Sequence, residues 1–546
     1  MTRWNFADVW ESVAGMQPER AAIHQGDRTV SWAEFNRHAN ALARFLVERG
    51  LTHQSKIGAY LRNSPEYLMA YFAAYKAGLI PFNINFRYGA NELLYLLENA
   101  DAEAIVFHTE FAELVNTIRN RAAKVICWIA VPQPGHPIPD WAIPFGDIVS
   151  AYPGGDFRAS WDRSPDDIMM LYTGGTTGLP KGVMWRQEDA FSANGGGGNF
   201  VTGLPPMVSL DEGLKRLAAA QSRPVRLVCP PLMHGAGLSP SQSTLNAGGA
   251  VILLTSRGFD ATEAWLAIER HRAEAINIVG TAFALPMAEA LEHTTVPWDL
   301  SSVRAIFSSG AMLDSATRRT LLKYCPNAVI VDKLGASEIS SLGEAITRPG
   351  QDVKTAVFTP SKGCALISAD GYPLELRPGA RGLLASSHLV ALGYYKDANK
   401  TAETFREIGG VRFGVSGDYA EIDADGNIRL LGRESQCINT GGEKVFAEEV
   451  EEALKSHPKV RDAAVVGVPD PRFGSKIFAV VELVTSSSVV TLAELAEHAG
   501  RFLAPFKLPR ALRVVPSIDR LPNGKLDYKK IKAMIQVDQG SLPGPV

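Results

Sequence analysis

Residues 30 to 110 alternate between helical and extended hydrophobic patterns. Ser31 and Glu34 form a capping box ahead of an apolar stripe that stops at Gly50, which predicts a helix. Short apolar runs and further helical patterns then follow one another. They predict strands at 56–61, 79–84 and 104–107 and helices at 65–77 and 91–99. This βαβ rhythm is typical of a layered α/β fold.

The C-terminal part of the chain carries a second, self-contained pattern. It predicts helices at 447–455 and 492–503 and strands at 463–468, 477–483 and 511–515. A boundary at 432–435 would leave a small domain of roughly 110 residues, which is an ordinary domain size. We therefore predict an α/β protein with a large multi-layer domain at 1–432 and a small α/β domain at 433–546. Two stretches, 132–144 and 194–206, are rich in proline or glycine and are predicted to be surface loops.

Composition and charge narrow the class of protein. The chain is 46% hydrophobic and 21% charged, as in an ordinary globular protein, and its net charge is −3. Without a concentrated Lys/Arg tract there is no electrostatic footprint for a nucleic acid or an anionic membrane. The five cysteines are scattered, and no apolar run is long enough to cross a bilayer. We expect a cytoplasmic protein with reduced thiols and no stable membrane insertion, and a homo-oligomer remains open.

The clearest chemical signal is a loop that follows an apolar strand at 167–172. Its glycine N–H groups can converge on an anion, its threonine hydroxyls add donors, and Lys181 supplies a mobile charge for the β- and γ-phosphates. Pro180 before the lysine and Gly182 after it rule out a Walker A loop. A plain hairpin turn remains the alternative for the Gly-Gly-Thr-Thr-Gly stretch by itself. The candidate phosphate-binding residues are Thr173, Gly174, Gly175, Thr176, Thr177, Gly178 and Lys181.

The string from Tyr172 to Gly182 closely resembles the phosphate-binding motif of the adenylate-forming superfamily, which includes acyl-CoA synthetases, luciferases and adenylation domains. The resemblance implies further motifs, and they follow in order. In the segment 231–237, His234 is expected between the nucleotide and the acyl group. For 308–311, the resemblance implies a backbone that lines adenine. For 333–338, it implies that the Ser337 hydroxyl contacts the α-phosphate and that Glu338 holds Mg²⁺. The residues concerned are Gly310, Ala311, Lys333, Leu334, Gly335, Ser337 and Glu338, the last being the metal ligand.

The resemblance also assigns roles near and beyond the predicted boundary. Asp418 and Arg433 correspond to the pair that binds ribose, and Ser435 to the hinge of a mobile C-terminal lid. The Gly-rich strand that follows the hinge is expected to approach coenzyme A. Its residues are Gly441, Gly442 and Lys444. Near the end, Lys525 matches the lysine that reaches the active site in one lid orientation, so the expected catalytic residues are Thr173, His234, Glu338 and Lys525.

Each downstream motif has a plainer interpretation when it is taken alone. A histidine beside glycines is usually a loop or core residue, Ser337-Glu338 would suit a solvated helix start, and Pro-Asn-Gly-Lys525 would suit an ordinary turn. The chain also departs from the family at two positions. Leu334 stands where an aromatic residue often stacks on adenine, and Ser435 stands where the pivot is often Asp or Lys.

The resemblance implies an AMP-forming acyl-CoA ligase that uses ATP, Mg²⁺ and coenzyme A. The strings at 172–186, 393–396 and 436–444 look most like fatty acid and steroid side-chain acyl-CoA synthetases, with an acyl pocket expected along 279–283, 308–312 and 336–342. The alternatives are a luciferase-like or carrier-independent adenylate-forming enzyme and a non-catalytic nucleotide-binding homologue. A peptide-synthetase module is not expected, because the chain stops at Val546, soon after the lysine motif.

Overall fold

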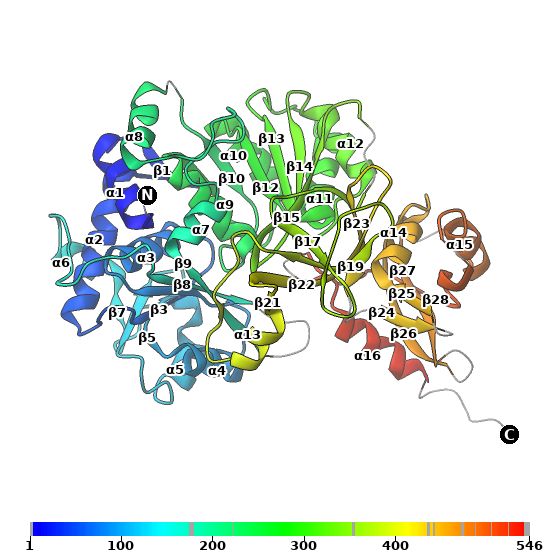
Figure 1. The fold of residues 1–546 in the computed structure, drawn as a ribbon. Helices are drawn as coiled ribbons and strands as arrows, with labels where there is room; N and C mark the ends of the chain where they lie inside the picture. Colours follow the sequence, from blue (N-terminus) through cyan, green and yellow to red (C-terminus); the bar gives the residue numbers. More distant parts are fainter. Residues whose placement is uncertain are drawn as a thin grey trace. The chain divides into compact units, whose positions relative to one another are not determined.

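In the computed structural model the chain forms two compact units (Figure 1). Unit 1 comprises Met1–Thr355, Ser361–Gly363 and Ser386–Gly414, and unit 2 comprises Ala356–Pro360, Cys364–Ala385 and Val415–Val546. The structure describes all residues except 1–3, 174–178, 221, 352–354, 434–436, 441–442, 471–473, 486–487, 504, 522–523 and 540–546. No helix among the described residues combines the length and the apolar character needed to cross a membrane.

The first sheet of unit 1 is mostly parallel and ends in the antiparallel strands β9 and β20. In spatial order its strands are β20 (Gly393–Tyr394), β9 (Lys181–Arg186), β8 (Ile168–Thr173), β4 (Ile80–Asn83), β3 (Lys56–Tyr60), β5 (Ala102–His108), β6 (Cys127–Val131) and β7 (Ile143–Pro144). This sheet contains the strands that the sequence predicts at 56–61, 79–84, 104–107 and 167–172.

The second sheet of unit 1 is parallel through its centre, with antiparallel strands at its ends. Its strands, in spatial order, are β2 (Arg28–Ser31), β1 (Ala21–Gln25), β11 (Ala250–Leu253), β10 (Val225–Val228), β12 (Ala275–Ile278), β13 (Ala305–Ser309), β14 (Val329–Ala336) and β15 (Ile339–Thr347). Alternate residues of these strands enter different cores. Val251 packs on the face shared with the first sheet, and Ile252 packs on the opposite face.

Helices pack between and outside the two sheets. The central core contains α1 (Phe6–Met16), α2 (Trp32–Glu48), α3 (Pro65–Lys76) and α9 (Gly235–Asn246). The outer face of the first sheet packs on α4 (Ala90–Ala100) and α5 (Ala112–Ile118), and that of the second packs on α10 (Ala261–His271), α11 (Gly280–His293) and α12 (Ser315–Tyr324). The remaining elements are α6 (Phe145–Ala151), α7 (Gln187–Ala193), α8 (Leu210–Ala219), α13 (Ala398–Thr404), β21 (Phe405–Ile408) and the short 3₁₀ helix Thr109–Phe111. The predicted multi-layer α/β architecture is confirmed.

The helix limits follow from local chemistry. Ser31 caps α2 by accepting a hydrogen bond from the Glu34 N–H at 3.1 Å, as the capping box predicts. α3 begins with Pro65. At this first position an N–H would have no acceptor within the helix, so the N–H that proline lacks costs no hydrogen bond. Every residue of α3 is buried because this helix lies in the central core, so it shows no polar face.

Unit 2 begins with an antiparallel set of strands. They are β16 (Val357–Pro360), β17 (Cys364–Ile367), β18 (Pro373–Leu374), β19 (Arg381–Ser386), β22 (Val411–Ile422) and β23 (Ile428–Arg433). The last residue of β19, Ser386, and the first residues of β22, 411–414, belong to unit 1. Because unit 2 includes 364–385 and 415–432, compactness alone does not place a boundary at residue 432. The division at 432–433 therefore stays a prediction.

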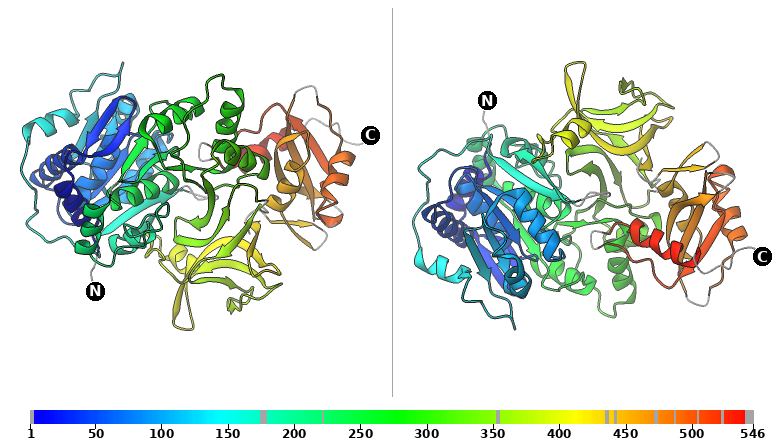
Figure 2. Two further views of the ribbon diagram at one scale, coloured as in Figure 1. Left: turned by 90° about the horizontal axis from the view of Figure 1, so that it is seen from above. Right: turned by 90° about the horizontal axis from the view of Figure 1, so that it is seen from below.

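The rest of unit 2 is a small α/β arrangement (Figure 2). Its elements are the hairpin β24 (Cys437–Thr440) and β25 (Glu443–Phe446), the sheet β26 (Val460–Asp470), β27 (Gly474–Leu483) and β28 (Ala511–Val515), the helices α14 (Ala447–Lys455), α15 (Leu492–Ala499) and α16 (Tyr528–Gln539), and a 3₁₀ turn at Pro505–Lys507. One face of the sheet packs on α14 and α15 and the other on α16. The helix predicted at 492–503 ends earlier, at Ala499, because the next residue is Gly500 and glycine has a low helix propensity.

Candidate nucleotide and acyl site

The predicted phosphate loop, residues 173–181, is flanked by the paired strands β8 and β9. Thr173 at the end of β8 is directly opposite Lys181 at the start of β9. A side chain at Gly182 would begin 2.9 Å from the Tyr172 ring, so only glycine fits there. Five of the seven residues between the strands, Gly174, Gly175, Thr176, Thr177 and Gly178, lie outside the described residues, so their role stays a prediction.

Asn83 joins the base of the loop to the histidine motif. Its Oδ1 accepts from the Tyr172 N–H at 2.6 Å, and its Nδ2 donates to the carbonyls of Tyr172 at 2.8 Å and Met233 at 2.6 Å. Thr173 and His234 are the next residues along these two segments. One buried amide therefore sets their spacing, because a buried amide left without partners would cost about 1–3 kcal/mol.

His234 is the N-cap residue of α9, with extended backbone, and its side chain is partly buried. The bend before it is compact. A Cβ on Gly237 would lie 2.3 Å from the Pro231 carbonyl oxygen, and the His234 N–H donates to that same oxygen at 3.0 Å. Gly237 therefore allows the close approach of the helix to its preceding turn.

The segments expected beside adenine are adjacent in the second sheet. Ser309 of β13 is paired with Lys333 of β14, and Gly310 follows with a φ of +83°, a conformation that favours glycine. The structure thereby brings Gly310 and Ala311 to the same end of the sheet as Lys333, Leu334 and Gly335. Contact of these residues with a nucleotide stays a prediction.

Ser337 and Glu338 form the turn between β14 and β15, and they do not begin a helix. The alternative of a solvated helix start is therefore excluded. Direct hydrogen bonds tie this turn to the phosphate-loop hairpin and to the segment just before β20. Trp185 of β9 donates from Nε1 to the Ser337 carbonyl at 2.9 Å, and the Ala391 N–H donates to the Glu338 carbonyl at 3.0 Å. The two motifs thus belong to one connected part of unit 1.

Glu338 and Lys181 each form a hydrogen bond with a side chain from residues 393–397. The Tyr394 hydroxyl donates to Glu338 Oε1 at 2.7 Å, and Lys181 Nζ donates to Asp397. The hydrogen bond from Lys181 holds the pKa of Asp397 below its ordinary value, so this carboxylate stays ionised. Burial raises the pKa of Tyr394, so its hydroxyl keeps the proton that it donates.

Two of the three segments expected to line the acyl pocket, 279–283 and 308–312, are in contact. The Gly280 N–H donates to Ser308 Oγ at 3.1 Å, and the Thr281 N–H donates to the Met312 carbonyl at 2.9 Å. Gly280 has a φ of +51°, and a Cβ there would lie 2.3 Å from that same carbonyl oxygen. The pairing of 279–283 with 308–312 agrees with the prediction, whereas the acyl pocket itself stays a prediction.

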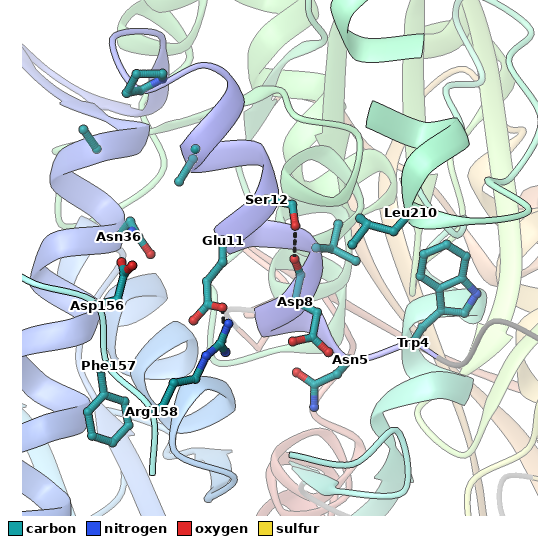
Figure 3. A pocket seen from close by; sticks show the side chains of 15 residues that line it. Trp4, Asn5, Asp8, Glu11, Ser12, Asn36, Asp156, Phe157, Arg158 and Leu210 are labelled. Carbon is teal, nitrogen blue, oxygen red and sulfur yellow. Dashed lines mark hydrogen bonds and ion pairs between the residues drawn. The ribbon is translucent and has the colours of Figure 1, made fainter. Parts of the chain in front are cut away.

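A separate pocket of about 780 Å³ opens on the surface of unit 1 (Figure 3). It is lined by α1, the start of α2, residues 156–158 and Leu210. Arg158 Nη1 lies 2.9 Å from Glu11 Oε2, and Asp8 and Asp156 stand nearby in the same lining. None of the motif residues lines it, so this pocket is not the predicted acyl site.

The ribose pair of the sequence analysis is adjacent in unit 2. Asp418 of β22 is directly opposite Arg433 of β23, and the Asp418 side chain is buried. The Asp418 N–H donates to Ser416 Oγ at 3.1 Å. Gly432 has a φ of +131°, and a Cβ there would lie 2.2 Å from Glu448 Oε2, so a larger residue would displace this strand end. Only the backbone of Arg433 is described.

Lys525 lies on a turn near the start of α16, and its side chain is exposed. Arg520 fixes this turn: Nη1 donates to the Gly524 carbonyl at 2.9 Å, and Nε and Nη2 each donate to the Asp462 carboxylate at 2.7 Å. Such bidentate pairing is geometrically specific. Arg520 therefore links the backbone of this turn to the side chain of Asp462 in β26.

The remaining predictions for coenzyme A and the hinge are largely outside what the structure describes. Gly441, Gly442 and Ser435 are not among the described residues. Lys444 pairs with Asn439 in the β24–β25 hairpin, and only its backbone is described. In the described part of the chain no group of three or more His, Cys, Asp or Glu side chains converges on a metal position. A single acid such as Glu338 fits Mg²⁺, which takes few protein carboxylates and otherwise binds phosphate oxygens and water.

Sequence reasoning missed three residues that organise this site. Each of them, Asn83, Tyr394 and Asp397, forms a hydrogen bond with a motif residue or with its neighbour. The hydrogen-bonded partners are far apart in the sequence. Lys181 and Asp397, for example, are 216 residues apart. The Gly-Tyr-Tyr-Lys string at 393–396 was the one sequence signal that could have drawn attention to the region.

Comparison with known proteins defines the class to which this site belongs. The chain matches the AMP-binding enzyme family over residues 10–395 and the AMP-binding enzyme C-terminal domain over residues 449–525. The chain therefore belongs to the AMP-binding enzyme family, and the resemblance inferred from its motifs is confirmed.

Particular relatives are similar over almost their entire length. A medium/long-chain-fatty-acid–CoA/3-oxocholest-4-en-26-oate–CoA ligase of Mycolicibacterium smegmatis is 39% identical over 97% of this chain and 96% of its own. A 3-oxocholest-4-en-26-oate–CoA ligase of Rhodococcus rhodochrous is 39% identical over 97% and 95%. The solved structure of an anthranilate CoA ligase in complex with anthranoyl-AMP has a TM-score of 0.83 at 22% identity and covers 99% of both chains, which confirms the fold.

Proposed function

We propose that this protein activates a medium- or long-chain fatty acid or a steroid side-chain acid with ATP and transfers the acyl group to coenzyme A. The protein is an AMP-forming acyl-CoA ligase, as its family and its relatives indicate. The observation that best supports the adenylation step is the linkage of the phosphate-loop strand to the Ser337–Glu338 turn through Trp185. This linkage keeps a phosphate-binding lysine and an acidic residue on one connected framework.

In the first reaction, a carboxylate oxygen of the acid attacks the α-phosphorus of ATP, and pyrophosphate leaves. Several negatively charged oxygens crowd together, so catalysis depends on positioning and on positive charge. Lys181 and the loop at 173–178 would hold the leaving phosphates, and Lys525 would bridge the attacking carboxylate and the α-phosphate. Glu338 would hold Mg²⁺, which supplies further positive charge to the phosphates when it is bound.

Other residues would place the nucleotide and the acid. Asp418 and Arg433 would bind the ribose hydroxyls, and residues 310–311 and 333–335 would line the adenine. His234, at the N-terminus of α9, would separate the nucleotide from the acyl group. No protein nucleophile is needed, because the acid itself attacks the phosphorus.

In the second reaction, the thiol sulfur of coenzyme A attacks the acyl carbon, and AMP leaves. We expect the segment 441–444 to approach the pantetheine arm after the C-terminal region has turned at Ser435 and withdrawn Lys525. A closed site would also protect the acyl-adenylate, a mixed anhydride, from water. We further expect a cytoplasmic location, since four of the cysteines, Cys127, Cys229, Cys325 and Cys364, are free thiols.

The choice of acid rests on the relatives, whose names combine fatty acids with a steroid acid. The test is pyrophosphate release and acyl-CoA formation with octanoate, palmitate, 3-oxocholest-4-en-26-oate, ferulate and anthranilate. We expect turnover with the first three and little with the aromatic acids. Turnover confined to aromatic acids would contradict the substrate class. Absence of pyrophosphate release with every acid would instead favour a non-catalytic nucleotide-binding homologue.

A further inference from the structure

Residues 393–397, here called the anchoring segment, present consecutive side chains to three different parts of unit 1. Tyr394 donates to Glu338 Oε1 at 2.7 Å, and Asp397 accepts from Lys181. Between them, Tyr395 donates to Asp101 Oδ2 at 2.7 Å. Two of the three partners, Glu338 and Lys181, are the residues proposed to hold the metal and the phosphates. The third partner, Asp101, has no role in the proposed adenylation.

The backbone of the anchoring segment is fixed from both sides. Gly393 and Tyr394 form β20 and pair with Met184 and Val183 of β9, the strand that begins with Lys181. Gly393 has a φ of +150°, and a Cβ there would lie 2.6 Å from the side chain of Thr401 in α13. The β20 strand thus lies against the phosphate-loop hairpin on one side and α13 on the other.

The side chain of Asp397 is fixed as well. It is the N-cap of α13 and accepts from the Lys400 N–H at 2.9 Å, so its carboxylate cannot move without uncapping the helix. Thr401 accepts from the Tyr394 N–H at 2.9 Å, which ties the start of the segment to the same helix. Lys396, with a φ of +56°, is held by Asp101 at 2.7 Å. The segment is therefore a rigid support and not an adaptable loop.

We propose that Tyr394 and Asp397 are positioning residues, which hold Glu338 and Lys181 at a fixed spacing to receive the triphosphate and its cation. This inference rests on the proposed function. A lysine ammonium has three donors, so one hydrogen bond to Asp397 orients it and two donors remain for phosphate oxygens. A carboxylate has two oxygens, so the hydrogen bond from Tyr394 to Oε1 orients Glu338 with Oε2 directed toward another ligand.

The first experiment compares Tyr394→Phe and Asp397→Asn with Tyr395→Phe in the full-length protein. Tyr395→Phe is the matched control, because it removes a hydrogen bond of equal length from the neighbouring residue. Binding of a non-hydrolysable ATP analogue is measured by calorimetry with and without Mg²⁺, and Tm is measured for every variant. A hydrogen bond to a charged group contributes roughly 1.5–3 kcal/mol, which corresponds to about tenfold or more in binding.

The expected pattern separates positioning from general loosening of the fold. In Tyr394→Phe, the increase in affinity that Mg²⁺ produces should be about tenfold smaller than in the wild type. Binding without Mg²⁺ should be unchanged. Asp397→Asn should weaken binding about tenfold in both conditions. Tyr395→Phe should bind as the wild type does, with a change in Tm similar to that of Tyr394→Phe. If the two tyrosine variants bind alike, or if Asp397→Asn binds as tightly as the wild type, the proposal is wrong.

A double-mutant cycle tests whether each residue acts through its partner. Once Lys181→Met is present, Asp397→Asn should have little further effect on binding, and Tyr394→Phe should have little further effect on Glu338→Gln. Additive losses would overturn the positioning roles. If the wild type itself fails to bind the analogue, the proposed function fails. If it binds and the variants bind equally well, only this inference fails.

Discussion

The two lysines expected to act on ATP are held in different ways. Lys181, in unit 1, is partly buried, and its ammonium is paired with Asp397, a residue fixed at a helix N-terminus. Lys525, in unit 2, has an exposed side chain, and Arg520 secures the backbone of its turn by donating to the Gly524 carbonyl. The contacts described here thus fix the ammonium group of Lys181 and the backbone of the turn that carries Lys525.

This difference suits the two roles that we propose. A lysine that binds the same phosphates throughout adenylation gains from a fixed partner, because little entropy is then lost on binding. A lysine that enters the site in only one lid orientation needs a long side chain on a firm base.

The largest effect is expected for Lys525→Ala. Pyrophosphate release from acid and ATP should fall by about 10²–10³-fold, because a charge aimed at the transition state is lost. Conversion of supplied acyl-AMP and coenzyme A to the thioester should survive, which is measured separately. Lys529→Ala, an exposed lysine in the first turn of α16, four residues after Lys525, is the control and should leave both reactions unchanged. Equal loss of both half-reactions in the Lys525 variant would contradict its role.

A smaller effect is expected for Lys181→Met. This substitution keeps the aliphatic side chain and removes the charge that would hold the β- and γ-phosphates. The KM for ATP should rise by about tenfold or more, and the KM for the acid should change little, since a charge-assisted hydrogen bond contributes roughly 1.5–3 kcal/mol. Initial rates over a matrix of ATP and acid concentrations provide the measurement. A rise in the KM for the acid alone would place Lys181 outside the nucleotide site.

Arg520→Lys should have a more moderate effect on the same reaction. Lysine keeps the charge but cannot reproduce the bidentate contact with Asp462 and the third bond to Gly524. The turn would loosen, and adenylation should fall by about tenfold while thioester formation from acyl-AMP is retained. Arg513→Lys is a control outside the turn. If Arg520→Lys impairs both half-reactions equally, the turn does not act through Lys525.

The smallest effect concerns stability and pH. Glu451 is buried in unit 2, and burial, followed by the nearby charge of Glu448, raises its pKa from 4.5 to about 8. The native state therefore binds a proton that the unfolded state releases between these values, so stability should fall as pH rises from about 4.5 to about 8. Glu451→Gln imitates the protonated acid and can still accept from Tyr528 and from the Val465 N–H.

Thermal unfolding at pH 5 and pH 8 measures this effect. The fall in Tm over this interval should be smaller in Glu451→Gln than in the wild type by a few degrees, since about 1 kcal/mol shifts the Tm of a small domain by roughly 4–8 °C. Glu497→Gln, an exposed acid, should follow the wild type. An unchanged pH dependence in the Glu451 variant would mean that the native carboxyl is already ionised at pH 5.

Local chemistry made much of the fold predictable. The N-cap at Ser31, the helix 447–455 and the strand 511–515 agree with the structure, because capping residues and hydrophobic period act over a few neighbouring residues. The helix predicted at 492–503 ran too far, since its apolar pattern continues past Gly500 while the backbone does not. The ambiguity at Ser337-Glu338 also needed the structure, because the pairing of β14 with β15 decides that these residues form a turn.

The class of fold, the family and the order of the motifs can be read from the sequence, because these depend on residue types at short spacing. The residues that hold the motifs in place became visible in the folded structure. Asp397 meets Lys181 and Tyr394 meets Glu338 because β20 pairs with β9 and the β14–β15 turn approaches the same strand. Contacts between residues so far apart arise from the packing of sheets and helices, and no local pattern encodes them.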